Sequence, residues 1–214
     1  MRCGCRVFAA DSRPRVKGFS LFEVVVASSI LLMLGLILVM VLIPSFRVTG
    51  ETQKRASMQQ KALLVLRRIG NDVQDAVPAA ISVSAAPTVL AGQPVGEFTP
   101  EAGRLFLEEL WAYYQVGDEI RRVNWSAPGS PALSVTLQTN APTRLPQADL
   151  VAFTTSIIPR ALTLTGKVSS FSVTHAGVGS AVAGPITVDL TLGGQAGEPA
   201  RVEMRRLYSP RLGE

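Results

Sequence analysis

Residues that commonly carry chemistry are scarce in this sequence of 214 residues. Its only cysteines, Cys3 and Cys5, lie at the very start, and two thiolates are too few for a closed zinc site, so we interpret the pair as incidental. Everything after residue 5 therefore lacks a disulfide, a thiol nucleophile and a thiolate metal site. The single histidine, His175, has no histidine or cysteine partner for a familiar catalytic or zinc site. We interpret it as a surface residue or a hydrogen-bonded strand residue.

Short catalytic and ligand-binding motifs are also missing. The sequence contains no Gly-x-Ser-x-Gly, no phosphate-binding loop, no His-Glu-x-x-His and no calcium loop of alternating acids. The nearest acidic pairs are Glu108-Glu109 and Asp118-Glu119, and neighbouring side chains in a strand point to opposite faces. We interpret both pairs as solvated. The expectation is that the chain is not an enzyme and uses no cofactor and no metal.

Charge is sparse and unevenly placed. Charged residues make up 17% of the chain and hydrophobic residues 47%, a composition that favours folding over disorder. The formal net charge is +5, of which +4 belongs to residues 1–18. The charged residues of that segment are Arg2, Arg6, Asp11, Arg13, Arg15 and Lys17. The pI near 9.7 is therefore not a sign of nucleic-acid binding by the rest of the chain.

One long apolar run dominates the N-terminal region. Residues 24–43 are twenty consecutive residues without a charge, and at ~1.5 Å per residue a helix of that length crosses a bilayer core of ~30 Å. A secretory signal has a shorter apolar region, of about 7 to 15 residues, so we predict a membrane-spanning helix. The basic residues before it predict a cytoplasmic N-terminus and place the residues after Ile43 on the far side of the membrane.

Glu23 is a carboxylate at the start of this apolar helix. A charge inside a membrane helix costs about 2.5 to 3.5 kcal/mol on insertion scales, so it indicates a function. If the chain were cut after Gly18, the new amine of Phe19 would lie four residues before Glu23 and could pair with it, in the same chain or in a neighbour. The first turn of a helix also favours an anion, because its backbone N–H groups are unpaired.

The segment Gly18-Phe19-Ser20-Leu21-Phe22-Glu23, with Lys17 before it and the apolar helix after it, resembles the N-terminal signal of type IV pilins and type II secretion pseudopilins. The resemblance implies that a prepilin peptidase cleaves between Gly18 and Phe19 and methylates the new N-terminus at Phe19. It also implies that Glu23 serves in subunit assembly. The alternative is an uncleaved signal anchor with an accidental Glu23.

The polar segment after the run is predicted to continue the helix. Met58, Ala62, Leu66, Ile69 and Val73 recur at intervals of three and four, which gives one buried stripe. A helix from residue 19 to about residue 77 would be ~90 Å long. Pro44 predicts a kink, the helix could break at Gly70, and it should end before Pro78.

Residues 78–214 read as an antiparallel sheet. The predicted strands are residues 80–84, 104–107, 111–116, 119–125, 133–139, 150–154, 161–165, 168–174, 186–192 and 202–208. Gly117-Asp118 predicts a hairpin between two of them. Predicted surface loops are residues 92–100, 126–131, 140–147 and 193–199. Trp111, Tyr113, Tyr114 and Trp125 are interpreted as core, and Arg67-Arg68, Arg121-Arg122 and Arg205-Arg206 as solvated faces or subunit contacts.

The predicted fold class is α+β, a long N-terminal helix packed on a C-terminal antiparallel sheet as in pilins. Four segments follow: a cleaved cytoplasmic leader (1–18), a transmembrane and assembly helix (19–43), the amphipathic half of that helix (44–77) and a β-rich periplasmic head (78–214). The end of the helix, the hairpin and the last strand also resemble, more weakly, those of larger minor subunits, namely the J-type pseudopilin and the W-type minor pilin.

The expected function is therefore that of a minor pilin or pseudopilin, a structural or initiating subunit held as a single-pass protein in the bacterial inner membrane. Its expected partners are prepilin peptidase, other pilin or pseudopilin subunits and the inner membrane, with a secreted substrate or DNA at the tip as a further partner. The main alternative is a membrane-anchored binding module, a tip adhesin or DNA-uptake receptor. A membrane-anchored enzyme would require Asp, Glu, Ser or His175 to gather in one pocket.

Overall fold

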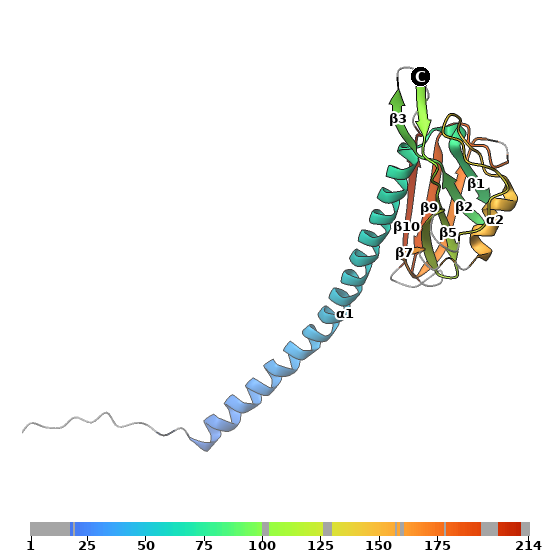
Figure 1. Ribbon diagram of the computed structural model, residues 1–214. Coiled ribbons are helices and arrows are strands. Elements are labelled where there is room, and N and C mark those ends of the chain that lie inside the picture. The colour runs from blue at the N-terminus through green and yellow to red at the C-terminus, as the bar shows by residue number, and fades with distance from the viewer. Residues whose placement is uncertain are drawn as a thin grey trace, which may run out of the picture. The chain divides into compact units, whose positions relative to one another are not determined.

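The computed structural model describes residues 18, 20–99, 103–125, 130–156, 158, 161–177, 179–193 and 201–210 (Figure 1). The chain divides into two compact units, residues 1–49 and residues 50–214. The predicted α+β class is confirmed: one long N-terminal helix is followed by antiparallel strands.

The elements follow one another in the order helix, strands, short helix, strands. They are α1 (Leu21–Gln74), the 3-10 helix η1 (Pro78–Ala80), β1 (Ile81–Ala85), β2 (Thr88–Gly92), β3 (Val95–Thr99), β4 (Gly103–Phe106), β5 (Trp111–Val116), β6 (Glu119–Asn124), α2 (Gln147–Thr155), β7 (Leu162–Thr165), β8 (Val168–His175), β9 (Ile186–Leu192) and β10 (Val202–Tyr208).

Helix α1 is unbroken at the two residues that could have interrupted it. Pro44 and Gly70 both lie inside it, and the helix ends at Gln74, three residues short of the predicted end. Near Pro44, which has no N–H to donate, the Ser45 hydroxyl donates to the Val41 carbonyl at 2.8 Å. The break that the sequence left possible at Gly70 does not occur, and the Tyr208 ring packed against this position explains the glycine.

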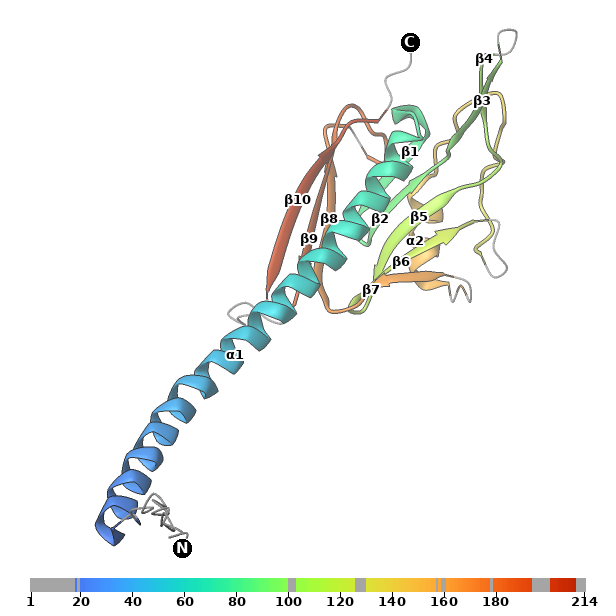
Figure 2. The ribbon, with the colours of Figure 1, turned by 90° about the vertical axis from the view of Figure 1, so that its left-hand side faces the viewer.

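In the second unit, the residues of α1 from Gly50 to Gln74 lie across two antiparallel sheets (Figure 2). The larger sheet has the order β1-β2-β5-β6-β7 and the smaller β10-β9-β8, while β3 and β4 form a separate hairpin. The predicted stripe is buried: Ala62, Leu66, Ile69 and Val73 join one core cluster with residues of both sheets. This confirms that the amphipathic half of the helix covers the sheets.

Strand β5 shows how the layers are built. Trp111 and Tyr113 belong to the core beneath α1, whereas Ala112 and Tyr114 belong to a second core on the other face. That second core is closed by α2 through Leu150 and Phe153, which lie three residues apart and so on one helix face. Because alternate residues of a strand point to opposite faces, a strand between two covering helices needs apolar side chains on both of its faces.

Two predicted strands are wrong. Residues 150–154 lie in α2, because burial of Leu150 and Phe153 on a sheet outweighs the β propensity of a short apolar run. Residues 133–139 form no strand. Their backbone groups bind side chains instead: Ser134 N–H donates to Asp149 Oδ2 and the Gln138 carbonyl accepts from Gln93 Nε2, both at 2.9 Å.

Two strands were missed in the region read as an irregular connection. Strand β2 pairs with both β1 and β5, and β3 pairs with β4 where residues 92–100 were predicted as a loop. Proline and glycine at both ends of these short runs hid them. The remaining predicted strands occur with ends within one residue of the structure. Residues 140–146 are irregular as predicted, whereas 126–129 and 194–200 lie outside the described residues.

Candidate functional site

The start of α1 holds the residues that the sequence singled out. Ser20 lies just before the helix and Glu23 in its first turn. The Glu23 Oε2 atom accepts from the Ser20 backbone N–H at 3.1 Å and faces the Ser20 hydroxyl at 3.4 Å, while Glu23 N–H donates to Ser20 Oγ at 3.2 Å. This reciprocal pair is a capping box, which pairs two backbone donors that a helix start otherwise leaves unpaired. The carboxylate is thus partnered within its own turn.

The Ser-x-x-Glu spacing of this cap is readable in the sequence, although only the contribution of Glu23 to the first turn was predicted from it. Gly18 is exposed, and a methyl group added to it would meet no atom within 4 Å, so the backbone at this position is open to a second protein. Phe19 and residues 1–17 lie outside the described residues, and their predicted roles at the cleavage site remain predictions.

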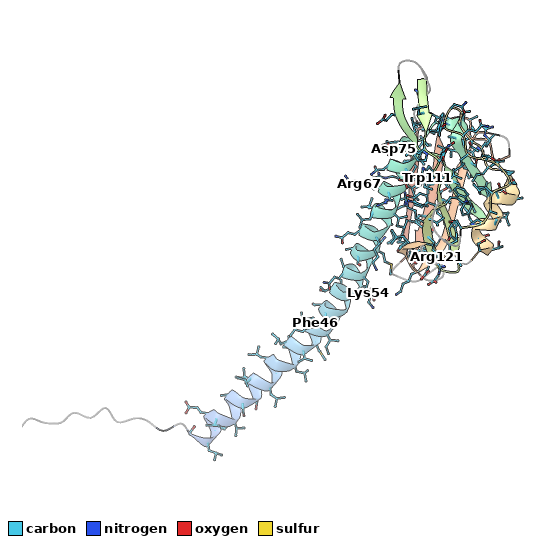
Figure 3. All side chains as sticks on the ribbon, viewed as in Figure 1. Phe46, Lys54, Arg67, Asp75, Trp111 and Arg121 are labelled. Carbon is cyan, nitrogen blue, oxygen red and sulfur yellow. The ribbon has the colours of Figure 1, made fainter. Side chains whose placement is uncertain are left out.

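Side chains of the apolar run have no cover in the first unit. Its large hydrophobic residues are all at least two-fifths exposed, for example Leu31 at 75% and Met40 at 67%. Figure 3 shows these side chains projecting from all sides of the helix, as far as the labelled Phe46. A helix that is apolar all round is stable only within a membrane or among other apolar helices. Its length and hydropathy make α1 a candidate membrane span.

In the second unit, a polar cluster joins α1 to β5 and β6. Asp72 Oδ2 accepts from Arg122 Nε at 2.8 Å and from the Tyr113 hydroxyl, and the Arg122 guanidinium lies 5.9 Å from the centre of the Tyr113 ring. Burial, reinforced by the Asp72 carboxylate, raises the pKa of Tyr113 well above its usual range. The prediction of a solvated arginine pair is wrong for Arg122, because its partner lies 50 residues away in sequence.

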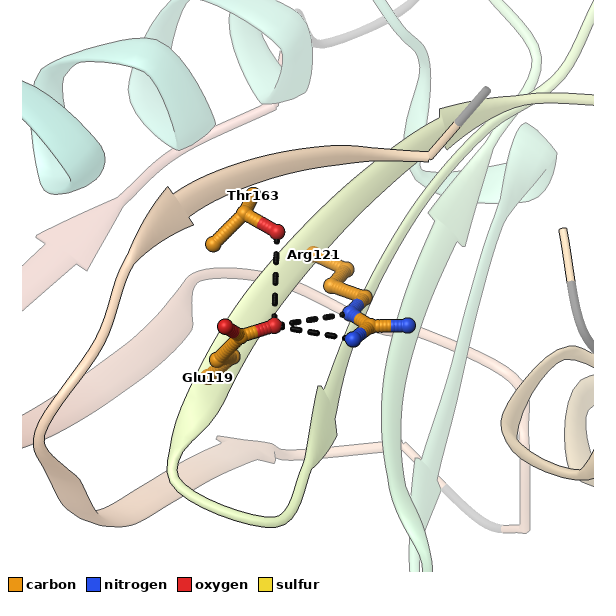
Figure 4. A network of polar contacts seen from close by, with 3 residues as sticks. All are labelled: Glu119, Arg121 and Thr163. Carbon is orange, nitrogen blue, oxygen red and sulfur yellow. Dashed lines mark hydrogen bonds and ion pairs between the residues drawn. The ribbon is translucent and has the colours of Figure 1, made fainter. Parts of the chain in front are cut away.

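A second arginine–carboxylate pair lies at the outer end of the same sheet (Figure 4). Glu119 Oε2 accepts from Arg121 Nε at 3.0 Å, from Arg121 Nη2 at 2.9 Å and from the Thr163 hydroxyl at 3.3 Å. Both charged side chains are 35% exposed. Glu119 is therefore paired rather than solvated as predicted, whereas Asp118, Glu108 and Glu109 are exposed. The contacts tie β6 to β7.

His175 ends β8, and its Nδ1 atom accepts from the Gly177 backbone N–H at 3.0 Å. This agrees with a hydrogen-bonded strand residue. Within the residues that the structure describes, no group of three metal-binding side chains comes together. Trp111, Tyr113 and Tyr114 are buried, as the core interpretation predicted, and Trp125 is half-buried with its Nε1 donating to the Pro131 carbonyl at 2.8 Å.

The distinctive site of the described chain is thus the capped start of an uncovered apolar helix. Compared with models of known protein families, the sequence gives no match. A comparison with curated proteins gives no match either.

Proposed function

We propose that this chain is a minor pilin or pseudopilin, processed after Gly18 and assembled into a filament through α1. The observation that carries the proposal is the combination of Glu23, capped by Ser20, with an apolar helix whose side chains are all exposed from residue 21 to residue 46. A plain membrane anchor needs the apolar run, but a glutamine at position 23 would complete the same cap without the cost of a charge. An assembly helix has a use for both the run and the charge.

The cap and the proposed cleavage are compatible. After a cut between Gly18 and Phe19, the Ser20 nitrogen remains an amide, so its N–H can still donate to Glu23. The new Phe19 amine would add a positive charge next to a carboxylate that already accepts from Ser20. Burying the apolar helix among neighbouring helices replaces its lipid contacts, and the charge pair then favours one register between them.

In the proposed arrangement, the leader is cytoplasmic, the apolar run of α1 spans the inner membrane and the second unit lies in the periplasm until the subunit enters a pilus or pseudopilus. Its proposed partners are prepilin peptidase and other pilin or pseudopilin subunits. The proposed position at the initiating end of the filament rests on the weaker similarity to J-type and W-type minor subunits.

The test is analysis of the N-terminus and intact mass of the membrane-extracted chain, made with and without a prepilin peptidase. We expect an N-terminus at Phe19 that depends on the peptidase and carries a methyl group. Gly18→Val should block the cut, whereas Gly50→Ala, at another open glycine, should leave it unchanged. A chain that keeps residues 1–18 beside an active peptidase would overturn the proposal and favour the membrane-anchored binding module.

A further inference from the structure

The second unit contains a cleft of about 1260 Å³. One wall is the part of α1 that begins at Gly50 and ends at Lys61. The opposite wall is formed by the Gly166-Lys167 turn between β7 and β8, with Asp118 and Gly193 beside it. Met58, Val168 and Leu192 contribute apolar surface to its lining. The cleft is therefore lined by charged, polar and apolar residues together.

Every lysine of the described chain lines this cleft. The sequence has 17 arginines but only four lysines, and Lys17 lies outside the described residues. The other three, Lys54, Lys61 and Lys167, come from two distant parts of the sequence and meet at the same cleft. No arginine with a described side chain is among its lining residues. Within the described residues, lysine is thus found only at this cleft, whereas arginine is used at other positions.

The backbone holds these lysines in place. Lys54 (labelled in Figure 3) and Lys61 are seven residues apart in α1, which is about two helical turns, so both stand on one face. Lys167 has a φ of 62°, a left-handed conformation that residues with a side chain adopt rarely. Its carbonyl accepts from Gly193 N–H, and the next residue, Val168, donates to the Asp118 carbonyl, both at 2.8 Å. A rare conformation fixed in this way often marks a functional position.

Among the described residues, the three ammonium groups have no ion-pair partner, and Asp118 is the only acidic residue that lines the cleft. The cleft is therefore positive and suited to an anion. Lysine binds phosphate as a mobile point charge, whereas arginine favours planar, two-pronged recognition. The described residues that line the cleft include no aromatic side chain of the kind that stacks on bases in nucleic-acid sites.

We propose that this cleft binds the phosphate of an anionic phospholipid headgroup. Its helical wall begins at Gly50, seven residues or about 10 Å after Ile43 in the same helix as the apolar run, and anionic lipids attract basic residues that lie close to a membrane surface. The apolar lining accommodates the glycerol end of the headgroup, and the lysines bind its charge. The proposal needs α1 to enter a membrane but does not need cleavage after Gly18, so the two can fail separately.

The lysines themselves provide the measurement. The full chain in bilayer discs of phosphatidylglycerol, or of phosphatidylcholine, is treated with an amine-acetylating reagent, and the extent of acetylation at each lysine is read by mass spectrometry. We expect less acetylation of Lys54, Lys61 and Lys167 in phosphatidylglycerol. Retention of phosphatidylglycerol, read by native mass spectrometry, should fall about fivefold for each lysine changed to glutamine. Arg55→Gln, a nearby charge on α1 that does not line the cleft, is the matched control.

Further acetylation measurements, with soluble competitors, identify the source of the phosphate. Protection by glycerol phosphate in phosphatidylcholine discs, as strong as that by phosphatidylglycerol, would support the phosphate chemistry and assign it to a soluble compound. Equal acetylation in both lipids and with soluble phosphate would overturn the proposal. Stronger protection by duplex DNA than by any lipid would overturn it in favour of a nucleic-acid site. The near-ultraviolet circular dichroism of each variant shows whether the fold is intact.

Discussion

The ring of Tyr208, in the last strand, lies directly on Gly70 of α1. A methyl group placed on Gly70 would stand 2.5 Å from Tyr208 Cε1, and the Tyr208 hydroxyl donates to the Leu66 carbonyl one turn earlier in the helix. Tyr208 is 6% exposed, so its ring has little room to move. Gly70, which the sequence suggested would weaken α1, is therefore the position that lets β10 pack closely against the helix.

Gly70→Ala is therefore expected to destabilise the protein, although alanine is the better helix former by about 1 kcal/mol. Forcing a methyl group against a buried ring costs about 1–3 kcal/mol. Gly50→Ala is the control, because that helical glycine has open space around it and should be neutral or stabilising. The measurement is thermal unfolding of the full chain in detergent, followed by near-ultraviolet circular dichroism. Equal midpoints for the two variants would show that Tyr208 does not constrain Gly70.

The adjacent arginines of β6 allow a test of how burial changes the strength of an ion pair. Arg122 and Asp72 are 15% and 16% exposed, whereas Arg121 and Glu119 are both 35% exposed. Asp72→Asn leaves a largely buried guanidinium without its counter-charge and should lower the free energy of unfolding by about 2 kcal/mol. Glu119→Gln should lower it by less than about 1 kcal/mol. Denaturant titration checks both values.

The two ion pairs differ in burial and also in the hydroxyl that their carboxylate binds, because Glu119 accepts from Thr163 whereas Asp72 accepts from the Tyr113 hydroxyl. Tyr113→Phe separates that hydroxyl from the ion pair, and a double-mutant cycle between Asp72→Asn and Arg122→Met isolates the charge interaction. A loss that is as small for Asp72→Asn as for Glu119→Gln would contradict the role of burial.

All three tyrosines are predicted to resist ionisation in the folded protein. Burial raises the pKa of Tyr208 to about 12 and raises the pKa values of Tyr113 and Tyr114 as well. In the unfolded chain each hydroxyl titrates near the ordinary value of about 10. As pH rises past 10, the unfolded state therefore loses protons first, and the free energy of unfolding falls from about pH 10 toward pH 12. Below pH 10 these groups contribute no pH dependence.

Tyrosinate absorbance provides the measurement. At a pH between 10 and 12 the folded chain should show little tyrosinate absorbance, and unfolding it with guanidinium should increase that absorbance. Tyr208→Phe should reduce the fall in stability over this pH range. Folded protein that ionises all three tyrosines near pH 10 would contradict their burial.

Regular alternation and turn chemistry explain which strands the sequence predicted. Residues 186–192 alternate between apolar and polar side chains, and the structure places β9 at those residues. Gly117, with a φ of 59°, makes the predicted hairpin between β5 and β6. These signals come from residues that are neighbours in the sequence, so the sequence alone is enough to recognise them.

Tertiary contacts decided the rest. α2 is a helix because Leu150 and Phe153 close a core against β2 and β5, and no pattern in the neighbouring sequence predicts that core. Asp72 and Arg122 lie 50 residues apart, and the three clustered lysines span more than a hundred residues, so neither site is visible as a motif. The Ser20–Glu23 cap is the opposite case, since its partners are three residues apart and their spacing alone predicts the contact.

Ser20 and Glu23 make it possible to separate the cap from the charge. Glu23→Gln keeps an acceptor for the Ser20 N–H, so the capping box survives without its negative charge. Ser20→Ala keeps the charge and removes the hydroxyl that accepts from Glu23 N–H, at a cost of about 1 kcal/mol to the helix start. If Glu23 pairs with an amine during assembly, Glu23→Gln should abolish incorporation into filaments, whereas Ser20→Ala should reduce it only slightly.

Incorporation can be followed by disulfide cross-linking between chains carrying Ala27→Cys, because residues 19–214 contain no other cysteine. Both variants should insert in the membrane and be cleaved after Gly18 as the parent is, which separates assembly from processing. Loss of cross-links in Ser20→Ala together with full cross-linking in Glu23→Gln would reverse the assignment. The carboxylate would then act only as a helix cap, and the apolar surface of α1 would be the sole determinant of how subunits associate.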